Sequence, residues 1–247
     1  MFARLFWATP LYLPLILHAS FIESTIGTTV VEDATATYYN PAALAGVKKK
    51  QGIALGSASR ASTVFTGQYT RSVDDYVQSG TSTAHANTLL PSLFYTMPLG
   101  PKIYLGTAIF ANDILREVDG FSILKYVQSN NRIDSIGFIP ALAVQLNKKI
   151  SIGAFLNRTH AAFLFEPLTG FPKLNIPDIK SRNKTTGESW GWDIGLLMKP
   201  LKSTTIGLNH RAALNFRMHG TSQYNGLIAD DYSFNYSIPS RTILSLA

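Results

Sequence analysis

Apolar and polar residues alternate with a period of two in several runs after residue 50. Such alternation puts apolar side chains on one face of an extended strand and small or polar side chains on the other. The longest run, 206–218, predicts one strand with an unbroken polar face, which needs lipid or a protein core on one side and water on the other. Its apolar face would hold Ile206, Leu208, His210, Ala212, Leu214, Phe216 and Met218.

The connections between these runs are alternately short and long. Tight turns at 97–101, 147–149 and 199–203 separate long polar segments at 112–133, 159–188 and 219–231, and the same parity makes 72–88 an outer loop. Outer-membrane barrels have short periplasmic turns and long outer loops, whereas a β-sandwich, the competing fold, has no reason for this asymmetry. Eight strands are predicted, at about 51–70, 89–98, 102–111, 135–147, 149–159, 189–199, 203–218 and 232–247.

Composition also favours a membrane barrel. Charged residues make up 15% of the 247 positions, against roughly 25% in ordinary soluble domains. Apolar residues reach 46%, yet after the first two dozen positions no run approaches the ~20 apolar residues of a membrane helix. We therefore predict an all-β fold, an antiparallel transmembrane β-barrel of outer-membrane type. Its interfacial aromatic girdles would include Trp190, Trp192, Tyr95, Tyr104 and Tyr232.

The first 24 residues are typical of a secretory signal peptide. They carry an early positive charge at Arg4, a short apolar core over 11–17 and small residues at Ala19 and Ser20. Two prolines interrupt the apolar core, so an uncleaved interfacial anchor is the alternative interpretation.

Several classes of chemistry are excluded by what the sequence lacks. Without cysteine there are no disulfides, thiol nucleophiles or cysteine-ligated metals. The net charge is +7, but only Lys48–Lys50 form a basic run and no nucleic-acid-binding motif accompanies it. No P-loop, G-x-S-x-G, H-E-x-x-H or G-x-G-x-x-G motif is present, and the five histidines lack metal-ligand spacing. We predict no enzyme activity, no cofactor, no metal and no nucleic-acid partner.

Residues 27–46 are small, polar and rich in turn formers, and they contain Asn40-Pro41-Ala42. This segment resembles the hatch, or plug, of the FadL family of outer-membrane hydrocarbon transporters, in which an acidic-Ala run leads into Tyr/Phe-Asn-Pro-Ala. Later pieces resemble strands of the same family in the same order: 91–106, 139–153, 190–211 and 236–239.

The resemblance implies a signal peptide over 1–24, a hatch over 25–50 and a barrel portion over 51–247. The family barrel has about fourteen strands and ends on an aromatic residue that the outer-membrane assembly machinery recognises. This sequence ends at Ser245-Leu246-Ala247 inside the eighth predicted strand. We therefore expect a barrel that lacks its C-terminal strands. The alternative is a small closed barrel, but eight strands leave no room for a plug.

The resemblance also implies the functional residues. In the hatch they are Asp33, Asn40, Pro41 and Ala42; Pro41 restricts Asn40 to extended geometry, so that Asn40 can bond the barrel wall and Asp33 can take backbone or basic partners. The alternative is a turn with no further role.

A hydrocarbon site needs apolar walls with few polar groups. The predicted ligand contacts are Tyr104, Phe110, Phe155, Phe163, Phe165 and Phe171, with Arg158 as carboxylate partner and His160 or Lys173 as alternatives.

The predicted function is uptake of long-chain fatty acids or other hydrophobic compounds through a plugged outer-membrane barrel. The expected partners are the hydrophobic ligand, outer-membrane lipid or lipopolysaccharide, which suits a basic rim, and the assembly machinery, and the protein is expected to be a monomer. Two alternatives stay open: a non-transporting partial barrel that serves as an adhesin or antigen, and a general porin.

Overall fold

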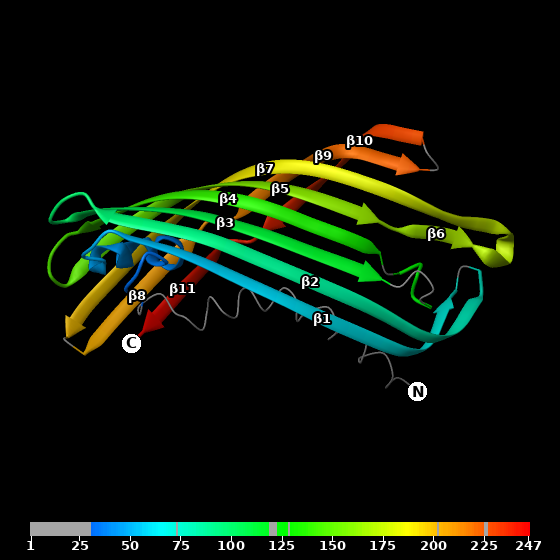
Figure 1. Ribbon diagram of the computed structural model, residues 1–247, viewed down its shortest axis with the longest axis horizontal. Coiled ribbons are helices and arrows are strands. Elements are labelled where there is room, and N and C mark those ends of the chain that lie inside the picture. The colour runs from blue at the N-terminus through cyan, green and yellow to red at the C-terminus, as the bar shows by residue number, and fades with distance from the viewer. Residues whose placement is uncertain (1–30, 73, 119–122, 128, 202, 225–226) are drawn as a thin grey trace.

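The computed structural model describes residues 31–72, 74–118, 123–127, 129–201, 203–224 and 227–247 (Figure 1). The predicted signal segment and the start of the predicted hatch, up to residue 30, lie outside the described residues. The elements are α2 (Ala36–Tyr39), η2 (Pro41–Gly46), β1 (Gln51–Arg71), β2 (Tyr76–Pro98), β3 (Ile103–Val118), β4 (Asn130–Gln145), β5 (Ile150–Glu166), β6 (Leu168–Phe171), η3 (Pro172–Leu174), β7 (Ile176–Leu201), β8 (Thr204–Arg211), β9 (Leu214–Tyr224), β10 (Leu227–Ile238) and β11 (Arg241–Leu246).

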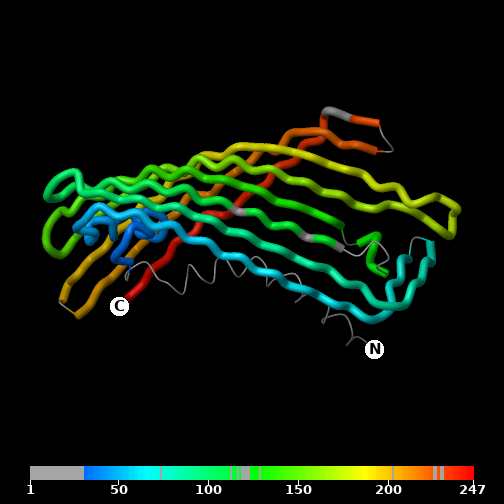
Figure 2. The backbone as a smooth tube through the Cα atoms, in the orientation of Figure 1, coloured from blue at the N-terminus to red at the C-terminus, as the bar shows by residue number. Residues whose placement is uncertain are grey.

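The strands form one antiparallel sheet with the order β1-β2-β3-β4-β5-β7-β8-β11. β9 pairs with the upper part of β7, meaning the part far from the short turns, and β10 pairs with β9. Figures 1 and 2 show long strands arching side by side, with the short turns at one end and the hatch tucked beneath the arch at that same end. We call the face that carries the hatch the inward face and the opposite face the outward face. Within the described ranges, no helix has the length and apolar character needed to cross a membrane.

The eight predicted strands are present as eight strand paths. Two paths are interrupted, one between β8 and β9 at Ala212 and Ala213, and one between β10 and β11 at Pro239 and Ser240. Proline cannot donate a ladder hydrogen bond, which explains the second break. The prediction of an all-β, antiparallel fold of outer-membrane type is confirmed.

The predicted loops at 72–88, 159–188 and 219–231 are wrong over most of their length. β2 starts at Tyr76, β5 runs on to Glu166, β7 begins at Ile176, and β9 and β10 meet across a tip after Tyr224. In this upper part most side chains are polar or small, and the apolar ones, such as Phe163, Leu164 and Phe165, do not alternate with polar ones, so the pattern that marks the lower strands is absent although the backbone ladder continues.

The single face predicted for 206–218 is also wrong. Between its pairing with Asp193 and its pairing with Thr186, the β8–β9 path uses eight residues where β7 uses seven. The extra residue at Ala212–Ala213 acts as a β-bulge and exchanges the two faces. As a result Leu208 is exposed on the outward face, whereas Phe216 and Met218 are buried on the inward face.

Candidate functional site

The hatch is built from a short helix and a 3-10 turn that follow each other closely. The Asp33 carboxylate accepts a hydrogen bond from the Thr35 backbone N–H at 2.9 Å and so organises the turn that leads into α2. Asn40 is extended, as a residue before proline should be, and its side chain accepts a hydrogen bond from the Ala42 N–H at 3.1 Å. Pro41 occupies the first position of η2, where its missing N–H costs nothing. The Asn-Pro-Ala sequence therefore caps its own helical turn.

The hatch sits on a floor of small residues on the inward face. Gly153 and Gly195 lie opposite each other on β5 and β7. A Cβ added at Gly153 would collide with the backbone of Pro41 and Ala42, and one at Gly195 would collide with the Asn40 side chain. Glycine is thus required here for close approach of the two backbones. The seat is completed by buried apolar side chains of both partners, including Leu44, Ile139 and Phe155.

Polar bonds fix the hatch to the wall at two points. The Ser151 hydroxyl donates to the Ala42 carbonyl at 2.9 Å, in a buried position. On the other side, the Arg211 guanidinium donates to the carbonyl of Tyr38 near the C-terminus of α2. The guanidinium also lies 4.2 Å from the centroid of the Tyr38 ring. The hatch is therefore held through its backbone as well as by apolar packing.

Arg211 is itself held by a buried carboxylate on the neighbouring strand. Asp193 on β7 pairs with Arg211 on β8 in the ladder, and their Oδ2 and Nε atoms lie 3.0 Å apart. The Asp193 side chain is fully buried and also accepts a hydrogen bond from Asn209. A buried ion pair is stable only when its remaining polar atoms are satisfied. The carbonyl of Tyr38 in the hatch accepts one of the remaining guanidinium hydrogen bonds, so the seated hatch helps to satisfy the pair.

Asp193, Asn209 and Arg211 were not among the residues predicted for the site. The sequence did contain a clue to Asp193. In the strand, Asp193 and Gly195 alternate with Trp192 and Ile194, so the carboxylate lies on the same face as the glycine. A charged residue on the small-residue face of a membrane strand needs a partner. The partner, 18 positions away, is fixed only by the strand register.

Farther from the hatch, aromatic side chains gather on the inward face of β5, β9 and β10. The Phe163 ring centroid lies 5.6 Å from that of Phe234 and 5.2 Å from that of Tyr236, both with edge-on geometry. Phe216 and Met218 are buried beneath them. We call these five residues the aromatic wall. It is the second apolar cluster of the inward face, and Phe163 is the only predicted ligand contact that lies in it.

The structure separates the other predicted ligand contacts. Tyr104 and Phe155 are buried beneath the hatch, and Phe110 stacks on Tyr38 with ring centroids 5.2 Å apart. Phe165 is exposed near the upper end of β5, and Phe171 lies at the tip that joins β6 to η3.

The predicted carboxylate partners lie away from the inward face or at its tips. Arg158 and His160 are on the outward face, where Arg158 bonds Glu188 at 2.8 Å. Lys173 donates to the backbone carbonyl of Asp75 at the tip of the β1–β2 hairpin.

The predicted aromatic girdle is found in part. Trp190 and Trp192 are exposed on the outward face. Tyr104 and Tyr232 belong to the inward face, so their assignment to the girdle is wrong.

The outer tips of the strands are tied together by a third cluster. The Arg71 guanidinium lies over the rings of Tyr126 and Phe171, 4.7 Å and 4.5 Å from their centroids. Asp178 accepts hydrogen bonds from Lys125 Nζ at 2.6 Å and from the Tyr126 hydroxyl. Partial burial alone would raise the pKa of Asp178, but these two bonds outweigh it and hold the pKa below its usual range. These contacts join the β1–β2 hairpin, the segment 123–127 and the β6–β7 tip at the outer end of the sheet.

Among the residues that the structure describes, no group of three or more His, Asp or Glu side chains is arranged to hold a metal ion. The structure as a whole is a curved sheet with two apolar clusters on its inward face. The hatch is seated at one end of this face, and the strand tips are bonded to one another at the other end.

Solved structures of similar fold include a FadL homologue and two toluene transporters. A FadL homologue from Pseudomonas aeruginosa is 17% identical with a TM-score of 0.74, and the match covers 89% of this chain and 62% of that one. The toluene transporter TodX of Pseudomonas putida is 14% identical with a TM-score of 0.60, covering 86% and 61%. The toluene transporter TbuX of Ralstonia pickettii is 15% identical with a TM-score of 0.58, covering 86% and 62%. The chain therefore spans less than two thirds of the length of the structures that it matches.

No curated protein sequence matches the chain. Residues 26–236, however, match the sequence profile of a family described as outer membrane protein transport protein (OMPP1/FadL/TodX). The match covers most of the chain and includes the hatch, the wall and the aromatic wall. This protein is therefore a member of the OMPP1/FadL/TodX family of outer-membrane transport proteins, and not an enzyme.

Proposed function

We propose that this chain takes part in the uptake of hydrophobic compounds across the outer membrane, by a path along the inward face that the hatch controls. The observation that carries the proposal is the seat of the hatch. Backbone hydrogen bonds, a glycine floor and a buried ion pair all converge on residues 38–42. A segment that merely terminated the chain would need no such seat.

The hatch contacts fit a plug that can leave its place. The buried Thr37 hydroxyl has no hydrogen-bond partner among the described residues. An unsatisfied buried polar group lowers the stability of the seated state by about 1–3 kcal/mol. The seat is thus strong at the Asp193–Arg211 pair and weaker on the β3 side, where Thr37 faces Gly106.

The aromatic wall supports a ligand of hydrocarbon character. Phe163, Phe234 and Tyr236 offer ring faces with few polar atoms above the buried Phe216 and Met218, which suits an apolar tail or an aromatic ring better than a hydrated solute. Thr159 and Asn157, bonded to each other at 3.0 Å on the adjoining part of β5, offer polar contacts for a headgroup. We propose long-chain fatty acids or aromatic hydrocarbons as the substrate class. A general porin, which needs a wet interior, is less well supported.

The test is binding of a fluorescent long-chain fatty acid to the purified chain in detergent, with unlabelled oleate and toluene as competitors. Phe163→Ala removes the centre of the aromatic wall and should weaken binding roughly tenfold, because losing a well-placed aromatic contact costs about 1.4 kcal/mol or more. Phe138→Ala is the matched control, since Phe138 is an exposed phenylalanine on the outward face of the neighbouring strand.

Equal loss of affinity in the two variants would contradict the proposed path. Binding of neither oleate nor toluene by a chain that shifts on an unboiled gel would favour the non-transporting alternative.

A further inference from the structure

The outward face carries an apolar band and, above it, charged side chains. On β3 the outward residues from Ile103 to Ala111 are all uncharged, and the first charge is Asp113. Asp134 on β4 and Glu188 on β7 are likewise the first outward charges above Ile136 and Trp190. Nine strand residues at about 3.3 Å each, tilted by about 40°, give a band of about 23 Å, close to the apolar height of outer-membrane strands. On β5 the first outward charge is Arg158, which lies level with Phe138 and Trp190 and pairs with Glu188. The outward charges therefore begin at the upper edge of the apolar band.

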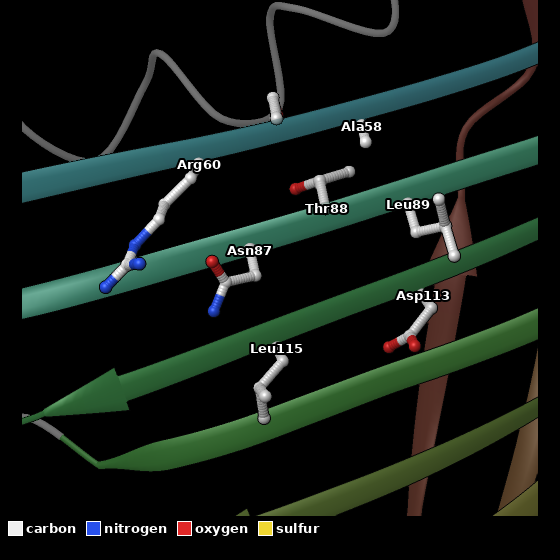
Figure 3. Close-up of a pocket in the computed structure, with 8 residues that line it drawn as sticks. Ala58, Arg60, Asn87, Thr88, Leu89, Asp113 and Leu115 are labelled. Atoms are coloured by element: carbon white, nitrogen blue, oxygen red, sulfur yellow. The ribbon is translucent and has the colours of Figure 1, made fainter.

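Three shallow depressions adjoin one another along this boundary. The first lies on β1, β2 and β3, where Arg60, Asn87 and Asp113 project from one face (Figure 3). The second shares Leu89 and Asp113 with the first. The third lies on β4, β5, β7 and β9 and has a volume of about 400 Å³. We call this third depression the basic groove.

Arginine, lysine and histidine side chains line the basic groove together with Asp134. Arg132, Arg182, Lys184 and His219 surround a floor that includes Ala162 and Thr186. Acidic groups compensate part of this charge: Arg132 bonds Asp113 and Asp134, and Arg182 bonds Glu166. Lys184 and His219, in contrast, have no acidic partner among the described residues. The groove therefore keeps donors for an anion, while its two arginines are held in place.

The groove lies directly above lipid-facing side chains. Phe138 and Trp190 are exposed on the same face, two outward positions below Asp134 and Thr186 on their own strands. Four residues of strand correspond to about 13 Å. One amphipathic molecule can therefore place acyl chains against the band and an anionic headgroup in the groove. A free anion would use only the upper half of this surface.

We propose that the basic groove binds the phosphate of the phosphorylated glycolipid, of lipid A type, that forms the outer leaflet. Lys184 and His219 supply donors to the phosphate, and Arg182 and Arg132, which are held by carboxylates, supply further N–H donors from their guanidinium groups. The acyl chains lie over Phe138 and Trp190. This site is on the opposite face from the aromatic wall, so it does not depend on the proposed transport path.

The experiment measures retention of defined lipids by the purified chain in detergent, using native mass spectrometry. The probes are lipid A with its phosphates, the same glycolipid after enzymatic dephosphorylation, and inorganic phosphate. We expect lipid A to be retained at least several-fold better than the dephosphorylated form. Lys184→Glu should weaken retention roughly tenfold, and Lys184→Arg should restore it.

The matched control is Lys148→Glu, which makes the same charge change at an exposed position in the β4–β5 turn, at the opposite end of the strands. A heat-dependent gel shift shows that each variant is folded, and Lys184→Arg gives a second readout if Lys184→Glu does not fold. Equal retention of the dephosphorylated glycolipid, competition by inorganic phosphate at equal concentration, or equal loss in Lys148→Glu would each overturn the proposal.

Discussion

The two ends of the same sheet are built in opposite ways. At the hatch end, the inward side chains are buried, and several polar groups are paired between the hatch and the wall. At the outer end, the strands carry polar residues on both faces, and ion pairs such as Arg158–Glu188 are exposed. The β5–β7 ladder is regular through both halves. The difference lies entirely in what the side chains meet.

This difference separates a functional seat from a solvated wall. A buried contact at the hatch end has no water to replace a lost partner, whereas an exposed contact at the outer end has water at hand. Substitutions of one chemical type should therefore cost much more at the hatch end. The first three predictions below compare a hatch-end residue with an outer-end or solvent-exposed counterpart, and the fourth concerns the outer tips alone.

The largest difference is expected between two ion pairs. Asp193→Ala leaves the buried Arg211 uncompensated and should lower the free energy of unfolding by about 3–5 kcal/mol. Glu188→Ala removes one partner of an exposed pair and should cost about 0–1 kcal/mol. Urea unfolding in detergent, followed by tryptophan fluorescence, measures both. Comparable losses would contradict the assignment of Asp193–Arg211 as the buried anchor of the hatch.

A smaller but specific effect is expected from the glycine floor. Gly153→Ala brings a Cβ into the backbone of Pro41 and Ala42 and should cost about 1–3 kcal/mol through overpacking. Gly56→Ala on β1 is the control, because its added Cβ meets nothing within 4 Å. The readout is the rate of protease cleavage within residues 31–50. That rate should rise roughly tenfold in Gly153→Ala alone, and an unchanged rate would show that the hatch does not rest on this floor.

Single hydrogen bonds provide a finer comparison. Ser151→Ala removes the buried donor to the Ala42 carbonyl and should cost about 1 kcal/mol. Ser62→Ala removes an exposed hydroxyl that bonds His85 at 2.8 Å, and water can replace it. Amide hydrogen exchange of the hatch should accelerate in the first variant and stay unchanged in the second. The opposite order would mean that Ser151 does not hold the hatch.

The smallest effect concerns the outer tips and pH. Since the pKa of Asp178 is lowered in the folded state, its carboxylate contributes stability above the unfolded value of about 4. That contribution is lost as the pH falls through the folded pKa. A ¹³C titration of the carboxyl group should show a midpoint below the ordinary aspartate value, and Lys125→Met should raise it. A midpoint that does not respond to this substitution would rule out the Lys125 contact.

The lower half of the fold could be predicted from the sequence because lipid on one face imposes the alternation. Outward Ile152 and Leu156 alternate with inward Gly153 and Phe155 in plain view. In the upper half polar residues occur on both faces, so Thr185 and Thr186 give no hint of facing opposite ways. The bulge at Ala212–Ala213 was missed because alanine suits either face.

In the candidate site, the local motif of the hatch could be recognised in the sequence, but the distant residue that contacts the hatch could not. Asn40-Pro41-Ala42 carries its own turn chemistry, and its helical turn could be anticipated from proline alone. Arg211 reaches Tyr38 across 173 positions, a contact that only the folded wall defines. Whether Arg158 pointed inward or outward depended on the phase of β5, which is fixed by pairing with β4 and β7.

The central claim is that the hatch occupies this seat in the membrane and that passage requires it to leave. The sequence has no cysteine, so a pair can be introduced cleanly. Gly46 and Lys199 line one small pocket between the hatch and the wall, and the added Cβ at Gly46 meets nothing within 4 Å. The measurement is uptake of labelled oleate by cells that carry Gly46→Cys with Lys199→Cys, before and after a short thiol cross-linker. Gly46→Cys with Lys180→Cys, at the outer end of β7, is the control.

The account predicts efficient cross-linking of the first pair only, loss of uptake on cross-linking, and recovery of uptake after reduction. Unchanged uptake with a fully cross-linked hatch would contradict it.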